Sequence, residues 1–120
     1  MATGDTKKNA AEAATSKVEV LDKATYEDDP SCLTIVFHEE DHTIGNSLKH
    51  IISRYPEVEF CGYNVPHPLE DKILFRIQTK EGHNAGDCLK RGLKELEQIF
   101  GAVRRTFENR MGEFEGKIDV

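Results

Sequence analysis

The chain has 120 residues, enough for one domain and too few for two independent hydrophobic cores. Apolar residues make up only 38% and the net charge is −6, so part of the chain is expected to be tail and the folded part to depend on a partner. Direct binding of nucleic acid is not expected, because no Lys or Arg occurs between Ala24 and Leu48 and a duplex-binding domain needs a basic stripe.

Three widely spaced cysteines and no C-x-x-C pair favour free, buried thiols over a zinc knuckle or a disulfide framework; they are Cys32, Cys61 and Cys88. No secretory signal and no membrane-spanning run is evident, so an intracellular, soluble protein with no membrane contact is expected. Small polar residues predict a disordered tail over residues 1–16. The domain is predicted over 17–111 and a frayed tail over 112–120.

The first half of the domain predicts two strands and a helix. Residues 17–22 read as a short edge strand, and residues 32–38 as a strand with one buried face. Apolar residues at helical spacing then run from Ile44 to Tyr55, with Thr43 as the expected N-cap and Pro56 ending the helix.

The second half repeats this order. Residues 58–65 and 72–79 predict two strands, joined by a stiff proline-containing loop. A long helix is predicted from about Asn84 to Met111. The order β-β-α-β-β-α predicts an α+β fold, in which an antiparallel four-stranded sheet carries both helices on one face.

The second helix is too long for its own sheet. At ~1.5 Å per residue it would extend about 40 Å, whereas a compact domain of this size is only about 35 Å across. Its apolar stripe continues to the far end, which predicts a partner chain that packs on this stripe and on the first helix. The expected interface comprises Leu48, Ile51, Ile52, Tyr55, Leu89, Leu93, Leu96, Phe100, Val103 and Phe107. The alternative is a helix that bends at Gly101 and folds back over its own core.

His38-Glu39-Glu40-Asp41-His42 matches the zinc-protease pattern H-E-x-x-H letter for letter. That chemistry needs both histidines on one helix face. Here His38 ends a predicted strand and His42 precedes a predicted helix, so a solvated acidic turn is favoured. A zinc hydrolase using His38, Glu39 and His42 is the minor alternative; otherwise no catalytic residue, metal or cofactor is expected.

Three stretches together, DHTIGNSLK, PEVEFCGY and HPLEDKILFRIQT, resemble the small alpha-like subunits of RNA polymerase over residues 32 to about 107. The fold is then similar to archaeal subunit L and to the dimerisation domain of bacterial alpha. The hallmark H-T-[LI]-G-N reads here from His42 to Asn46. Within the family, EVEFCGY and RIQT look more like the subunit shared by RNA polymerases I and III than its polymerase II counterpart.

This resemblance implies a non-catalytic nuclear role, including the nucleolus. The chain would pair with the larger alpha-like subunit, and the heterodimer would form the platform on which the largest and second-largest subunits assemble. The resemblance also places the partner contact at the start of the first helix, namely Thr43, Ile44, Gly45 and Asn46.

Gly45 would admit a partner's backbone or be tolerated near a helix start, and Asn46 would bind the partner or act as a cap. The outer side of that helix is either solvated or in contact with a large subunit, through Lys49, His50 and Arg54. A homodimeric α+β domain that binds a small ligand is the remaining alternative.

Overall fold

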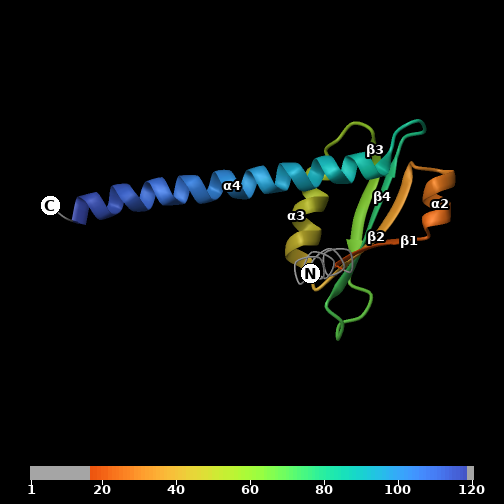
Figure 1. Cartoon of the computed structure of the whole chain (residues 1–120), viewed down its shortest axis with the longest axis horizontal. Coiled ribbons are helices and arrows are strands. Elements are labelled where there is room, and N and C mark those ends of the chain that lie inside the picture. Colours follow the sequence, from red (N-terminus) through yellow and green to blue (C-terminus); the bar gives the residue numbers. More distant parts are fainter. Residues whose placement is uncertain (1–16, 119–120) are drawn as a thin grey trace, which may run out of the picture.

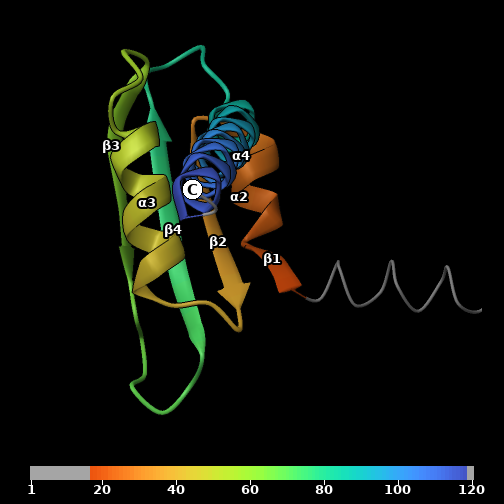
Figure 2. The same cartoon turned by 90° about the vertical axis from the view of Figure 1, so that its left-hand side faces the viewer.

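The computed structural model describes residues 17–118 as one antiparallel four-stranded sheet with two of its helices on one face, the second of which projects far beyond the sheet (Figures 1 and 2). The elements are β1 (Val18–Leu21), α2 (Lys23–Asp28), β2 (Cys32–His38), α3 (His42–Ile52), β3 (Val58–Asn64), β4 (Lys72–Thr79) and α4 (Ala85–Ile118). The strand order is β1-β2-β4-β3. Across residues 17–118 no helix has the combination of length and hydropathy needed to cross a membrane.

The strand register brings the apolar alternation of each strand to one face. Ile35 of β2 lies opposite Phe75 of β4, and Phe75 lies opposite Tyr63 of β3. Because side chains alternate along a strand, these residues share the face on which α3 and α4 pack. The largest fully buried side chains are Ile35, Leu48, Ile52, Ile73, Phe75 and Ile77. The predicted α+β fold is confirmed.

A glycine lets the two helices cross closely. A Cβ atom on Gly92 of α4 would lie 2.5 Å from Cγ1 of Ile52 and 3.3 Å from Cδ1 of Leu48. Both are fully buried α3 side chains. Any larger residue at this position would push α4 away from α3, so Gly92 sets the distance between them.

One short helix was not predicted. Asp22 begins α2: it adopts a left-handed conformation with φ of 53°, and its carboxylate accepts hydrogen bonds from the Thr25 amide and hydroxyl. The Tyr26 hydroxyl then reaches Asn84 Oδ1 at 2.8 Å, just before α4. This six-residue helix has no apolar repeat, which explains why periodicity missed it.

Three predicted boundaries are wrong. The N-cap of α3 is Asp41, not Thr43: its carboxylate accepts the Thr43 amide at 2.9 Å. This helix ends at Ile52, and Tyr55 lies in the turn that follows.

The helix α4 runs to Ile118 instead of Met111, so the predicted fraying from residue 112 is wrong as far as 118. Helix-favouring residues and the ion pair of Arg110 with Glu113 continue it. The predicted tail 1–16 and residues 119–120 lie outside the described residues.

Candidate protein interface

The helix α4 has a seated half and a projecting half (Figure 1). In the seated half, Ala85 to Leu96, one face packs on the sheet and on α3, and Cys88, Leu89 and Leu96 are buried. Beyond Leu96 every described residue of α4 is exposed except Gly101, which is half-buried. The helix continues through Gly101 without folding back, so the alternative of a bend there is wrong.

The projecting half carries an uncovered apolar seam. Phe100, Phe107 and Phe114 follow one another seven residues apart and are 52%, 63% and 55% exposed. A repeat of seven with apolar residues in between is typical of the seam of a coiled coil. We call this set, together with the exposed Leu93 of the seated half, the α4 seam; its members are Leu93, Ile99, Phe100, Val103, Phe107, Met111 and Phe114.

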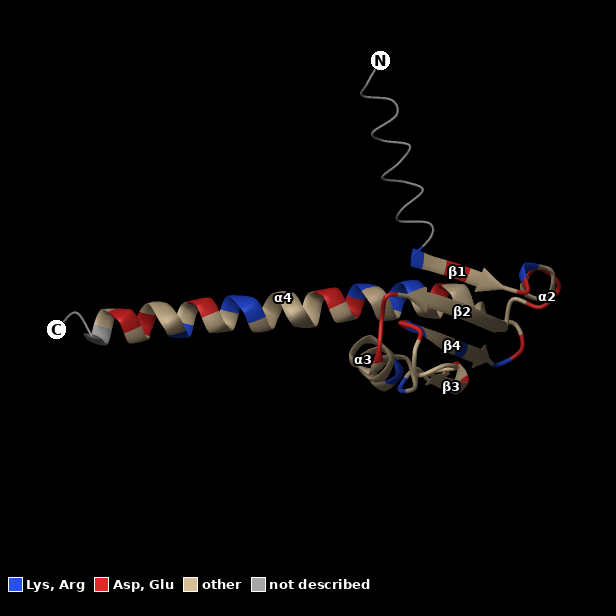
Figure 3. Cartoon of the chain, turned by 90° about the horizontal axis from the view of Figure 1, so that it is seen from below, with Lys and Arg blue, Asp and Glu red and all other residues tan. Residues whose placement is uncertain are grey.

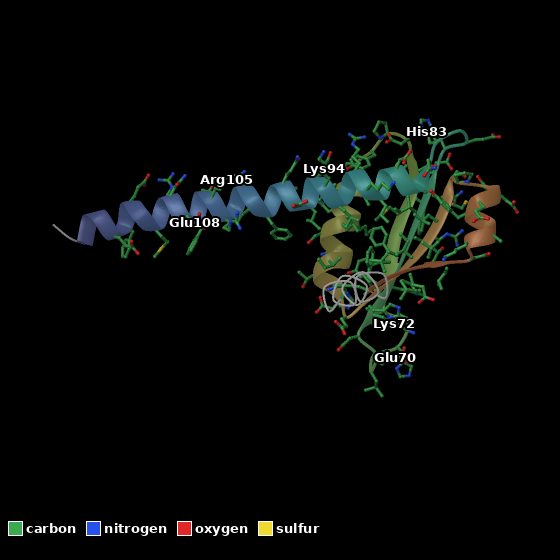
Figure 4. All side chains as sticks on the ribbon, in the orientation of Figure 1. Glu70, Lys72, His83, Lys94, Arg105 and Glu108 are labelled. Carbon is green, nitrogen blue, oxygen red and sulfur yellow. The ribbon has the colours of Figure 1, made fainter. Side chains whose placement is uncertain are left out.

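Charged residues cover the rest of the projecting half. In Figure 3 bands of acidic and basic residues alternate along it with uncharged ones. Arg104 pairs with Glu108 at 3.9 Å, and the labelled side chains of Lys94, Arg105 and Glu108 extend into open space in Figure 4. A helix that is charged on one side and apolar on the other is suited to pack against a second protein surface.

Two sets of predicted interface residues belong to the core of the chain. Leu48, Ile51 and Ile52 of α3 are buried beneath α4, with Tyr55 in the turn that follows. Leu89 and Leu96 are 7% exposed in the same cluster. The chain's own sheet and helices cover these six residues, and their contact with a partner stays a prediction.

A polar clamp holds α4 at the turn after α3. The Arg91 guanidinium lies 4.0 Å from the centroid of the Tyr55 ring, a cation–π contact. It also pairs with Glu57 at 3.4 Å and Glu95 at 3.5 Å. The Tyr55 hydroxyl is buried and makes no hydrogen bond within residues 17–118. Burial, with the Glu95 carboxylate adding to it, raises the pKa of Tyr55 to about 12.

The stretch His42 to Asn46 serves mainly to seat β3 against α3. His42 Nδ1 lies 2.9 Å from the Tyr63 hydroxyl, and the rings meet edge to face. A Cβ on Gly45 would lie 2.6 Å from Cδ2 of Tyr63. A ring of the same chain therefore fills the space beside Gly45, and the approach of a partner's backbone at Gly45 stays a prediction. Thr43 and Asn46 are exposed and Ile44 is half-buried.

The two histidines of the H-E-x-x-H match do not converge. His38 lies on β2, with Nε2 3.1 Å from Glu19 Oε2, whereas His42 lies on α3 against Tyr63. Glu39 between them has φ of 58°, which turns the chain between strand and helix. In the described part of the chain, no group of three or more His, Cys, Asp or Glu side chains could hold a metal ion.

The three thiols are not paired with one another, and the outer side of α3 is open to solvent. The cysteines are free, as predicted, although Cys32 is only half-buried. Burial raises the pKa of Cys61 to about 11 and raises that of Cys88 as well. Lys49, His50 and Arg54 are exposed. Sequence reasoning missed Phe114 because its segment was predicted to fray, although its spacing of seven from Phe107 would have revealed it.

Residues 32–106 match the family described as the RNA polymerase Rpb3/Rpb11 dimerisation domain. The chain is similar to "Probable DNA-directed RNA polymerases I and III subunit RPAC2" of Caenorhabditis elegans, with 63% identity over 92 residues, 77% of this chain and 64% of that protein. It therefore spans less than two thirds of that relative's length.

Two further comparisons agree. "DNA-directed RNA polymerases I and III subunit RPAC2" of Danio rerio is 51% identical over 86 residues, covering 72% of this chain and 77% of that protein. The crystal structure of DNA-directed RNA polymerase subunit L from Thermoplasma acidophilum matches with a TM-score of 0.66 over 82% of this chain and 92% of that one. At 19% identity the structural match supports the fold alone.

Proposed function

The chain belongs to the RNA polymerase Rpb3/Rpb11 dimerisation-domain family, and on that premise we propose that it is a subunit shared by DNA-directed RNA polymerases I and III. It pairs with the larger alpha-like subunit of those enzymes. The heterodimer is the platform on which the largest and second-largest subunits assemble. The chain supplies no catalytic group, does not touch nucleic acid, and works in the nucleus, including the nucleolus.

The observation that carries this proposal is the uncovered α4 seam. Its three phenylalanines are each more than half exposed, so at ~200 Å² of surface per ring they present about 300 Å². A stable interface buries about 800 Å² on each partner. The seam with its flanking residues supplies much of that area, and an exposed apolar patch of a few hundred Å² often marks a contact with another protein.

We assign the partner contact to the α4 seam and to the exposed start of α3. The seam faces a helix of the larger subunit, since only a second helix can follow a repeat of seven along its length. Thr43, Ile44 and Asn46 form the secondary contact. The large subunits meet the outer side of α3, at Lys49, His50 and Arg54.

The solution mass of the chain tests the proposal, measured alone and after co-expression with the larger alpha-like subunit. Aggregation or instability alone and a one-to-one complex on co-expression are expected, because the partner covers the α4 seam. A stable monomer indifferent to that subunit would contradict the proposal. A discrete homodimer alone, stabilised by a small molecule, would favour a ligand-binding domain instead.

A further inference from the structure

The edge of the sheet at β3 is open. β3 pairs with β4 and with no other strand in the described part of the chain. In Figure 2 it forms the left-hand edge, at the opposite side of the sheet from β1. It has seven residues and no proline. The outward backbone groups of such a strand are a template for another strand.

A groove runs along this edge and is lined by residues of both faces of the sheet. Gly62 of β3 lies directly across from Arg76 of β4, and Thr34 of β2 lies on the other side of Arg76. Gly62 has no side chain, and the ring of Phe60, 52% exposed, lies over it: a Cβ atom on Gly62 would lie 3.0 Å from Cζ of Phe60. The groove has a volume of about 510 Å³ and is lined by Thr34, Lys49, Phe60, Cys61, Gly62, Tyr63, Asn64, Leu74 and Arg76.

Two cations without acidic partners flank the same edge. Arg76 lies on the open face, and Lys49 comes from α3 on the helical face; both are exposed. Neither forms an ion pair with any residue between 17 and 118, whereas Lys72 nearby is paired with Glu70 at 2.9 Å. The strand β3 itself carries the exposed Glu59, so two cations and one carboxylate leave this edge with a net charge of about +1 in a chain with a net charge of −6.

We propose that the free edge of β3 binds an acidic, extended segment of another protein, which adds to the sheet as a fifth strand. Main-chain hydrogen bonds to β3 provide the register. Side chains of an added strand alternate between the two faces. One set therefore meets Arg76 and Phe60, and the other meets Lys49. This surface is separate from the α4 seam and does not depend on the heterodimer.

The probe is a capped peptide of the length of β3 in which glutamate alternates with valine, titrated by fluorescence anisotropy against the full chain. Saturable binding is expected. The double variant Lys49→Glu/Arg76→Glu should raise Kd at least tenfold, and both positions are exposed, so the fold is retained. The control Lys90→Glu/Lys94→Glu changes net charge equally on exposed parts of α4 and should leave Kd unchanged.

Hydrogen exchange separates strand addition from simple charge attraction. Bound peptide should slow exchange of β3 amides, and a matched peptide with lysine in place of glutamate should not bind. The proposal is overturned by any of three results: no saturable binding, equal loss of binding in both double variants, or protection confined to α4. Concentration-dependent protection of β3 without peptide would also overturn it, since a second copy of the chain would then occupy the edge.

Discussion

The seated and projecting halves of α4 have the same apolar repeat but different surroundings. Leu89 and Leu96 of the seated half are 7% exposed, whereas Phe100 and Phe107, further along the same face, are 52% and 63% exposed. The amino-acid pattern does not change where the sheet ends. Periodicity therefore specifies which face of a helix is apolar, and the extent of the sheet decides how much of that face the chain covers itself.

This difference separates two kinds of damage. Substitution in the seated half removes contacts within the chain, so it lowers the free energy of unfolding before any partner is present. Substitution in the projecting half removes contacts that only a partner can make. Variants of the seated half should therefore show a loss of stability, and variants of the projecting half a loss of affinity for the partner.

The largest effect is expected from Leu96→Asp. A carboxylate replacing a buried leucine leaves both a cavity and an unpaired charge, so the free energy of unfolding should fall by about 5 kcal/mol, enough to unfold a small domain. Phe100→Asp, one turn further on, should stay within about 0.5 kcal/mol of wild type. Urea denaturation followed by circular dichroism measures both. Equal destabilisation would mean that Phe100 packs within its own chain.

Binding to the larger alpha-like subunit should depend on the projecting half instead. Phe100→Asp/Phe107→Asp removes two large apolar contacts worth about 1.5–2 kcal/mol each, so the Kd for the larger alpha-like subunit should rise a hundred- to a thousandfold. Gln98→Asp/Asn109→Asp is the matched control on the charged face of the projecting half. Pull-down and calorimetry with the larger subunit compare them. Unchanged pairing in the phenylalanine variant would place the interface elsewhere.

Much of the sheet could be predicted because apolar and polar residues alternate clearly along its strands. Residues 72–79 were predicted with the bounds that β4 has, since Ile73, Phe75 and Ile77 alternate with polar residues. The length of α4 was underestimated because its last two turns contain two glycines and charged residues, which resemble a frayed end. Ion pairs between successive turns also support the helix, but the spacing of apolar residues does not reveal them.

The candidate interface was predictable only in part. That α4 has an apolar face beyond its sheet follows from its length, and this was confirmed. Which residues stay uncovered depends on where the sheet ends. The residue that contacts Gly45 could not be predicted either, because only the register of β3 brings the Tyr63 ring next to Gly45.

Replacement of glycine by alanine should have opposite effects on stability in the two halves. Gly92→Ala places a methyl group 2.5 Å from Ile52, so α4 must shift, and a loss of about 1–3 kcal/mol is expected. Gly112→Ala meets no atom within 4 Å, so the better helix propensity of alanine should stabilise the projecting half by up to about 1 kcal/mol. Thermal denaturation of the two variants gives the comparison. A gain at Gly92 would show that the helix crossing is looser than described.

The smallest effect is expected at the junction of the halves, from Tyr55→Phe. The Tyr55 hydroxyl is buried without a hydrogen bond to any described residue, so removing it should stabilise the chain by up to about 1 kcal/mol at neutral pH. Tyr63→Phe is the matched control: it removes the hydroxyl that meets His42 at 2.9 Å, so it should destabilise. Chemical denaturation at pH 7 measures both changes.

Tyr55→Phe should also change how the free energy of unfolding depends on pH in the alkaline range. An unfolded tyrosine ionises near pH 10, whereas Tyr55 in the folded chain keeps its proton until about pH 12. The unfolded state therefore loses its proton first, and the free energy of unfolding falls as pH rises from about 10 to about 12. Tyr55→Phe should remove this part of the decline and leave the part due to Cys61, whose thiol has a pKa of about 11. An identical alkaline profile in both proteins would mean that the hydroxyl reaches solvent and that the clamp on α4 is open.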